Sequence, residues 1–216
     1  MQSEGLTYLT DEKLLRIESV LHRLGRAGLP GHYLEFGVAL GGSAVVIAKH
    51  ARNVGQSFEG FDVFGMIPAP ASVKDDEKSK SRYQTIKSGG SVGLGGKTYY
   101  GYQEDLYRSV CETFRSNNLD LTDGMTKLTK GLFEDTLPQT NIETICFAHV
   151  DFDCDWYDPV KLCLDYIAPR MCTGGVIVID DYHAYGGCRT ATDEFLAANP
   201  GFELKRGDNP FLEKTA

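Results

Sequence analysis

The sequence predicts an α/β fold, a doubly wound, mostly parallel sheet with helices on both faces. Two observations predict this fold. Apolar, strand-like runs alternate with helical patterns along the 216 residues, and three of these runs end in polar or glycine-rich segments, LEFG, FDVF and IVIDD. Alternation of this kind is typical of a parallel sheet. Because ligands bind beyond the carboxyl ends of such strands, we expect one domain with its site at that edge.

The N-terminal half supplies the first elements in order. Thr10 can cap a helix whose leucines and isoleucine recur at helical spacing until Gly28 and Pro30 end it. HYLEFGVA then predicts a strand that runs into glycines, SAVVIAKHA a helix, and SFEGFDVF a second strand. These elements form the first half of the expected sheet.

The C-terminal half continues the alternation. The patterns predict helices over residues 104–114, 160–167 and 189–196, and strands in TKLTKG, ETICFAHVDFD and GGVIVIDDY. FELKR and FLEKT are consistent with two short final strands. The sequence therefore predicts a single domain over residues 1–216.

The stretch between Gly65 and Gly101 fits no regular element. It contains Pro68, Pro70, the charge run KDDEKSK and a glycine-rich tract. A long irregular segment inside a compact domain is often a functional loop. We expect residues 65–101 to form a mobile, lid-like substrate loop.

Composition narrows the class of protein. The chain has 22 Lys and Arg against 30 Asp and Glu, a net charge of -8, which disfavours a nucleic-acid surface. Its six cysteines form no CxxC pair, which disfavours a zinc knuckle and suggests a reducing compartment. No leader-like start and no apolar run of about 20 residues is visible, so we expect no membrane span and a cytoplasmic protein.

The glycine loop LEFGVALGGSA suggests a cofactor. The loop lacks the G-x-G-x-x-G motif of a dinucleotide-binding fold, which disfavours a dinucleotide-dependent oxidoreductase. The alternative to a cofactor-binding loop is a plain tight turn between strand and helix. Glu35 suits an ammonium group, and Ser43 at a helix start suits a carboxylate. Asp62, after the next strand, could accept ribose hydroxyls. S-adenosylmethionine carries all three groups.

Two aspartate clusters predict a metal site. HVDFDCDWYDP places four aspartates after an apolar strand, and Asp180 and Asp181 end the next one. Carboxylates that converge raise one another's pKa, and a hard divalent cation such as Mg²⁺, Ca²⁺ or Mn²⁺ removes that penalty. Asp158 before Pro159 instead fits a helix N-cap, and His149 and His183 could each be core residues or functional ones.

These motifs together resemble a known family. LEFGVALGGS, FDVFGMIP, KGLFEDTLP, DCDWYDPVKLCL and GGVIVIDDYHAYGGCRTATDEF are similar to segments of the macrocin O-methyltransferase family. The resemblance runs from about Leu34 to Phe195. It implies a Rossmann-like class I methyltransferase fold, S-adenosylmethionine and Mg²⁺ as cofactors, and methyl transfer to sugar hydroxyls.

The resemblance also assigns roles to residues. Glu35, Gly37 and Ser43 would contact the methionine part of the cofactor and Asp62 its ribose. Gly131 and Phe133 would lie near the adenine. Anchoring the family's D-x-D-x-Y segment on Tyr157 makes Asp153 a metal ligand and Asp155 the general base, with Asp180 and Asp181 completing the metal set. Counting forward from DTLP instead assigns the two aspartates of that segment to Asp151 and Asp153, because two extra residues precede Tyr157. This second register keeps His149 open as the general base.

The expected function is Mg²⁺-dependent methylation of a hydroxyl on a sugar or glycoside, with a small-molecule or oligosaccharide acceptor. The alternatives are a phenol- or catechol-directed methyltransferase and a non-catalytic metal-binding module. We expect Tyr99, Tyr100 and Tyr102 either to stack on the acceptor or to pack in a homodimer.

Overall fold

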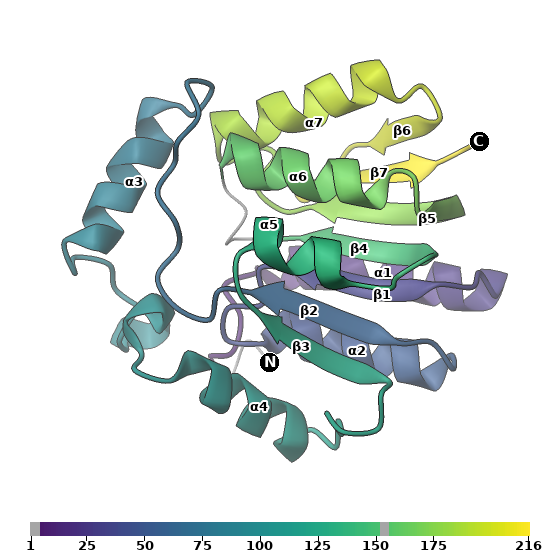
Figure 1. Cartoon of the computed structure of the whole chain (residues 1–216), viewed down its shortest axis with the longest axis horizontal. Helices are drawn as coiled ribbons and strands as arrows, with labels where there is room; N and C mark the ends of the chain where they lie inside the picture. The colour runs from purple at the N-terminus through teal and green to yellow at the C-terminus, as the bar shows by residue number, and fades with distance from the viewer. Residues whose placement is uncertain (1–4, 152–155) are drawn as a thin grey trace.

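A seven-stranded sheet forms the centre of the molecule (Figure 1), with strand order β3-β2-β1-β4-β5-β7-β6. The computed structural model describes residues 5–151 and 156–216. Strands β1 to β5 run parallel, and β7 is antiparallel to both β5 and β6. The predicted doubly wound, Rossmann-like architecture is confirmed.

The elements follow the expected order along the chain. The strands are β1 (His32–Phe36), β2 (Phe58–Asp62), β3 (Thr126–Lys130), β4 (Ile145–Val150), β5 (Met171–Ile179), β6 (Phe202–Lys205) and β7 (Phe211–Lys214). The α-helices are α1 (Asp11–Ala27), α2 (Gly42–Asn53), α3 (Glu77–Lys87), α4 (Leu106–Ser116), α5 (Phe133–Thr136), α6 (Tyr157–Ile167) and α7 (Gly186–Ala198). Thr10 caps α1 and Gly28, in a left-handed conformation, ends it, as predicted.

Helices cover both faces of the sheet. α1 and α2 pack on each other and on β5, β1 and β2, whereas α5, α6 and α7 cover the opposite face (Figure 1). The central strands are buried on both sides, so β4 is buried along its whole length. No helix in residues 5–151 or 156–216 combines the length and apolar character that a membrane crossing needs.

The direction of strand order reverses between β1 and β4. The chain winds from β1 outward to β2 and β3, then returns to β4 on the other side of β1. Glu35 is paired in register with His149, and the Asp151 amide donates to the carbonyl of Phe36. The Asp180 amide donates to the carbonyl of Val150. This switch point therefore brings the polar ends of β1, β4 and β5 together.

The segment over residues 65–101 is more regular than the sequence suggests. It contains α3 and two short 3-10 helices, and it lies beyond the carboxyl ends of the strands (Figure 1). Tyr99 and Tyr100 are fully buried, and the Tyr102 hydroxyl donates to the carbonyl of Ile86. The expectation that these tyrosines face an acceptor or a partner subunit is therefore wrong for Tyr99 and Tyr100, which pack inside the domain.

The charge run in this segment is an anchor. The Asp76 carboxylate caps α3 through the Ser79 amide and accepts from the Gly186 amide at the start of α7, both at 2.8 Å. Asp75 is 4% exposed and accepts from the Tyr157 amide at the start of α6, at 2.8 Å. Two adjacent carboxylates thus hold the N-termini of three helices.

This arrangement corrects the interpretation of Asp158. The N-cap position of α6 is Trp156, whose side chain makes no capping bond, and Asp158 lies inside the first turn. The carboxylate that receives the first amide of the helix comes from Asp75, 82 residues earlier in the chain. Local sequence cannot reveal a cap that is supplied from such a distance.

Candidate active site

The glycine loop connects β1 to α2 and is held in place by Asp62. Gly37 and Gly41 have φ angles of 89° and 88°, a region that favours glycine. One oxygen of Asp62 accepts from the amides of Val38 and Ala39, both at 2.8 Å, and the other accepts from the Phe64 amide. Asp62 is fully buried, so its carboxylate shapes the loop from inside.

Gly42 explains why the loop is so tight. A Cβ at this position would lie 2.4 Å from the carbonyl oxygen of Leu6, so no larger residue fits. The next residue, Ser43, lies in the first turn of α2 and is 3% exposed. The predicted strand, glycine turn and helix start are therefore confirmed, with the helix N-terminus directed at the edge of β1.

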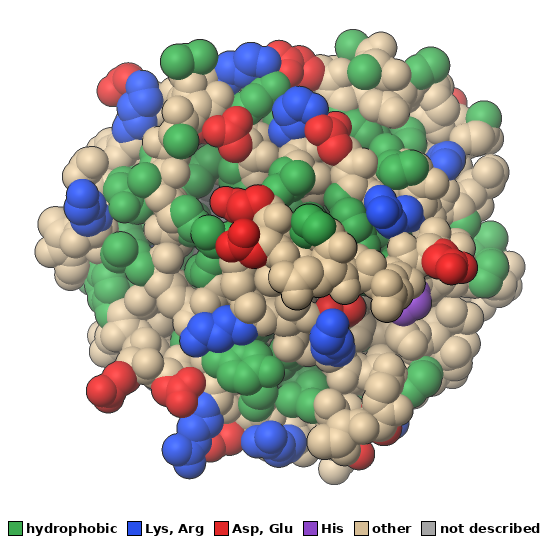
Figure 2. Space-filling model, viewed as in Figure 1, with side chains coloured by type: hydrophobic (Ala, Val, Ile, Leu, Met, Phe, Trp, Pro, Cys, Tyr) green, Lys and Arg blue, Asp and Glu red, His purple; other side chains and the backbone are tan. Residues whose placement is uncertain are grey.

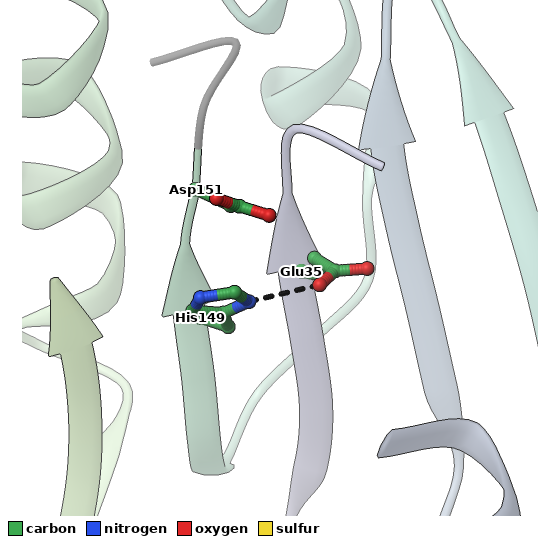
Figure 3. Close-up of side chains that lie close together, drawn as sticks. All are labelled: Glu35, His149 and Asp151. Carbon is green, nitrogen blue, oxygen red and sulfur yellow. Dashed lines mark hydrogen bonds and ion pairs between the residues drawn. The ribbon is translucent and has the colours of Figure 1, made fainter. Parts of the chain in front are cut away.

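Glu35 and His149 form a buried pair across β1 and β4. The Nδ1 atom of His149 lies 2.8 Å from Oε1 of Glu35, and both side chains are fully buried (Figure 3). Burial raises the pKa of Glu35, against the lowering effect of His149 and Ser43. Burial disfavours the charged imidazole, but Asp151 and Glu35 outweigh it and raise the pKa of His149 to about 9. The ring therefore carries a proton at neutral pH.

An acidic cluster lies next to this pair. Asp151, Asp180 and Asp181 are all buried, at 8%, 3% and 7% exposure. Burial raises the pKa of Asp151 well above its usual value; His149 opposes this, whereas Asp180 adds to it. Burial and Asp181 raise the pKa of Asp180, against Lys13 and His149. The carboxylates are thus close enough to repel one another, as the sequence predicts.

The atoms of the acidic cluster suit a hard cation. Among the described residues, Oδ1 of Asp180 and Oδ2 of Asp181 are buried without a hydrogen-bond partner. One atom each from Glu35, His149 and Asp151 also lie within 4.8 Å of one another, but the bond between His149 and Glu35 accounts for two of these three atoms (Figure 3). Buried oxygens without partners are costly, and carboxylates are the preferred ligands of Mg²⁺ and Ca²⁺. The residues present therefore fit a divalent cation.

The remaining candidates from the sequence are Asp153, Asp155 and His183. Asp153 and Asp155, the predicted metal ligand and base, lie outside the described residues. His183 bonds the carbonyl of Gly207 through Nε2 at 3.0 Å and is partly exposed, so it has a structural contact elsewhere. At the carboxyl end of β4 the structure places Asp151, directly after Val150.

An apolar cavity of about 370 Å³ opens beside the end of β2. Val63, Leu132, Phe133, Trp156 and Pro68 line it, and Pro68 belongs to the segment over residues 65–101. Figure 2 shows apolar side chains around a hollow on this face, between α3 and α5 of Figure 1. The indole of Trp156 donates to the carbonyl of Pro68 at 2.8 Å. A cavity of this size and lining suits a flat aromatic group.

Phe133 lines this cavity, and Gly131 lies two residues before it in the chain. The Gly131 amide donates to the carbonyl of Asp62 at 2.9 Å, which joins the ends of β3 and β2. Phe133 packs edge-on against Phe36, with ring centroids 5.7 Å apart. The glycine loop, the buried pair and the cavity thus form one continuous edge of the sheet.

Sequence reasoning missed one charged residue of the site. Lys13, in the first turn of α1, places Nζ 2.8 Å from Oδ2 of Asp180 and 3.2 Å from its carbonyl oxygen. Burial lowers the pKa of this amine, but Asp180, Asp181 and Asp151 raise it by more. Nothing in the local pattern of α1 shows that its first turn reaches the end of β5.

The fold and the site geometry define the class. A Rossmann-like sheet in order β3-β2-β1-β4-β5-β7-β6, with a glycine loop after β1 and an acidic residue after β2, is the class I methyltransferase fold. The family described as macrocin-O-methyltransferase (TylF) matches residues 97–201. The predicted resemblance to this family is thereby confirmed.

Curated relatives show the same relationship. The chain is 29% identical over 178 residues to demethyldecarbamoylnovobiocin O-methyltransferase of Streptomyces niveus, which covers 78% of this chain and 59% of that protein. It is 25% identical over 199 residues to mycinamicin III 3''-O-methyltransferase of Micromonospora griseorubida, over 88% of this chain and 69% of the relative. The matched region thus spans about three-fifths to two-thirds of these relatives.

Solved structures have the same fold. The O-methyltransferase NovP superposes with a TM-score of 0.78 and 22% identity, over 98% of this chain and 82% of that one. A calicheamicin methyltransferase superposes with a TM-score of 0.64 and 16% identity, over 93% and 77% of the two chains. The similarity therefore extends over nearly the whole chain, including the segment over residues 65–101.

Proposed function

We propose that this protein transfers a methyl group from S-adenosylmethionine to a hydroxyl of a sugar or glycoside, with the help of Mg²⁺. One observation carries the proposal. The glycine loop with its buried Glu35 and the acidic cluster of Asp151, Asp180 and Asp181 share the carboxyl ends of β1, β4 and β5. This combination serves both a sulfonium cofactor and a metal-bound hydroxyl.

The glycine loop supports the cofactor part of the proposal. Glu35 is an anionic side chain at the end of β1 and is suited to the ammonium of the methionine moiety. Gly37 lets the backbone approach the ligand, and Ser43 with the α2 N-terminus is suited to the carboxylate. The cavity beside Gly131 and Phe133 accommodates the adenine.

The ribose contact needs a refined role for Asp62. Its two oxygens already accept three backbone amides, so it positions the loop first of all. A carboxylate has about four lone-pair sites, which leaves capacity for one ribose hydroxyl. We therefore propose that Asp62 both holds the glycine loop and contacts the ribose.

The metal would be held by Asp151, Asp180 and Asp181. The open, buried oxygens of Asp180 and Asp181 support this set, and Asp153 remains a candidate beyond the described residues. A bound Mg²⁺ supplies Lewis acidity that lowers the pKa of a coordinated hydroxyl. The surrounding carboxylates then have a charge that offsets their mutual repulsion.

The general base remains Asp155 in this proposal. His149 is the less suitable candidate because its Nδ1 bonds Glu35 and its pKa of about 9 keeps the ring protonated at neutral pH. A ring that already carries the proton cannot accept another. His149 instead orients Glu35, while Asp155 takes the proton of the acceptor hydroxyl.

The choice of acceptor rests on the relatives. One is named for novobiocin methylation, and another, 26% identical over 170 residues and from Streptomyces olivaceus, is named for a rhamnosyl-tetracenomycin. The segment over residues 65–101, which lies beyond the strand ends, would close over such a glycoside. Residues 1–216 would act as a single methyltransferase domain.

The test combines binding and turnover. We expect S-adenosylhomocysteine to give calorimetric heat and to raise the melting temperature, while NAD does neither. Methyl transfer from labelled S-adenosylmethionine to a panel of deoxysugar glycosides should require Mg²⁺ and stop with a chelator. Absence of any S-adenosylhomocysteine binding at saturation would overturn the methyltransferase proposal.

The same panel separates the acceptor classes. Catechols and other phenols are included beside the glycosides at equal concentration. Faster methylation of phenols would replace the sugar acceptor with a phenol while leaving the cofactor assignment intact. Binding of Ca²⁺ without cofactor binding would instead indicate a non-catalytic metal module.

A further inference from the structure

Lys13 directly contacts the acidic cluster. Its Nζ atom bonds Oδ2 of Asp180 at 2.8 Å and the Asp180 carbonyl oxygen at 3.2 Å. The side chain is 21% exposed and that of Asp180 is 3% exposed, so the ion pair is largely shielded from water. Shielding of this kind makes the charge count for more than it would on an open surface.

The position of Lys13 is fixed from several directions. Thr10 caps the helix by accepting from the Lys13 amide at 3.3 Å. The side-chain amide of Asn209, a fully buried residue, donates to the Lys13 carbonyl at 3.3 Å. Arg16 donates through Nε to the Asn209 carbonyl at 3.0 Å. The first turn of α1 is thus bonded to the loop before β7, and the amine stays beside Asp180.

The ion pair leaves the other carboxylate oxygen available. Lys13 occupies Oδ2 of Asp180, while Oδ1 of Asp180 and Oδ2 of Asp181 are buried without a hydrogen-bond partner among the described residues. A cation held by those open oxygens would therefore bind next to the Lys13 ammonium. Like charges in a shielded site repel strongly.

We propose that Lys13 is a built-in counter-charge that stabilises the metal-free acidic cluster and lowers its affinity for a divalent cation. The proposal rests on the proposed metal site. Without a metal, the ammonium offsets part of the repulsion among Asp151, Asp180 and Asp181. With a metal, the same ammonium opposes binding, so the cation is held less tightly than three carboxylates alone would hold it.

A purely structural role makes a different prediction. If Lys13 only ties α1 to the end of β5, its removal lowers stability and leaves metal affinity unchanged or weaker, because Asp180 is less well oriented. A counter-charge role predicts lower stability together with tighter metal binding. The direction of the change in affinity separates the two.

The experiment is a titration with Mn²⁺, followed by its paramagnetic resonance signal, on chelator-treated protein at fixed ionic strength. Lys13→Met removes the charge and keeps the apolar stem, and we expect it to bind Mn²⁺ about tenfold more tightly than the parent. Lys13→Arg keeps the charge and should stay within about threefold of the parent. Arg23→Met, on the same helix but paired with Glu213, should leave the affinity unchanged.

Melting temperatures on the same samples supply the second readout. Metal-free Lys13→Met should melt below the parent, and added Mn²⁺ should raise its melting temperature by more than it raises that of the parent. If Lys13→Met fails to fold, Lys13→Gln is used, which is neutral but can still donate to Asp180 and should show the same tightening.

The outcomes separate this inference from the proposed function. Equal or weaker Mn²⁺ binding by a folded, neutral variant, with normal binding by the parent, would overturn the role of Lys13 alone. Absence of Mn²⁺ binding by every protein, with S-adenosylhomocysteine still bound, would overturn the metal site and this inference together but leave the cofactor assignment standing.

Discussion

This chain contains two pairs of consecutive aspartates that look alike in the sequence but serve different purposes. Asp75 and Asp76 lie before α3, and Asp180 and Asp181 follow β5. The first pair meets backbone amides at the N-termini of α3, α6 and α7. Among the described residues, the second pair faces another carboxylate, Asp151, together with Lys13 and His149.

The difference appears in one member of each pair, Asp76 and Asp180, since burial raises the pKa of Asp75 despite its amide partners. Burial alone would raise the pKa of Asp76, but the amides of Ser79 and Gly186 lower it by more, so the carboxylate is stable as an anion. Asp180 has the opposite balance, since burial and Asp181 raise its pKa despite Lys13. A carboxylate with amide partners stabilises the fold, whereas one facing like charges stores unfavourable energy that a cation can release.

The largest expected effect is on activity. Asp181→Asn removes a charge whose Oδ2 accepts no hydrogen bond from the described residues. Methyl transfer should fall by about 100-fold or more at limiting Mg²⁺, since even partners of metal ligands cost about 10- to 100-fold when changed. Added Mg²⁺ should restore part of the rate. The free energy of unfolding of the metal-free protein should not fall, because removal of this charge relieves its repulsion with Asp180.

A second prediction concerns the pH dependence of stability that arises from His149, beside the acidic cluster. The pKa of His149 is raised to about 9 from an ordinary 6.5, so its stabilising contribution is complete below pH 6.5 and is lost as the pH rises through about 9. At roughly 1.4 kcal/mol per pKa unit, this shift contributes at most about 3.5 kcal/mol. Denaturant unfolding with a chelator present should show the parent losing its advantage over His149→Gln between pH 6 and 9.5.

The amide-bonded pair, Asp75 and Asp76, supplies the control for the pH experiment. Asp76→Ala should lower the free energy of unfolding by about 1 to 2 kcal/mol, because it removes the caps of α3 and α7. This loss should be the same at pH 6 and pH 9.5, and Mn²⁺ affinity should be unchanged. Asp105→Ala, which removes the cap of α4 alone, should cost about half as much. Loss of metal binding in Asp76→Ala would contradict the division between the two pairs.

The smallest expected effect concerns the anchored segment over residues 65–101. Lys74 pairs with Glu194 and bonds the Tyr157 hydroxyl at an exposed position, where water screens the interaction. Limited proteolysis of the free protein should cut within residues 88–98 in preference to residues 74–80. Lys74→Met should speed cleavage by a few-fold, and cofactor with acceptor should slow it. Equal cleavage throughout the segment would show that the anchor does not hold.

Much of the fold could be predicted from the sequence because its signals are local. Helical spacing and a cap place α1, glycines mark the turn between β1 and α2, and apolar runs mark the strands. The carboxyl ends of those strands also predicted where the site lies, since topology brings them to one edge. That reasoning alone places four candidate residues at this edge of the sheet: Glu35, Ser43, Asp180 and Asp181.

The sequence could not assign partners to these side chains. Strand register pairs Glu35 with His149, and packing of α1 places Lys13 on Asp180. Asp158 has the local pattern of an N-cap, yet α6 begins one residue before it and receives its cap from Asp75. Each of these contacts joins segments that are far apart in the chain.

By itself, then, the sequence determined the order of elements, the glycine loop and the concentration of carboxylates at the strand ends, because periodicity, backbone conformation and residue charge are properties of short segments. Only the tertiary structure decided which aspartates bond helix amides and which face one another. A carboxylate has the same chemistry in both settings. Its pKa, its open oxygens and hence its role depend on the dipoles and charges that folding brings within a few ångströms.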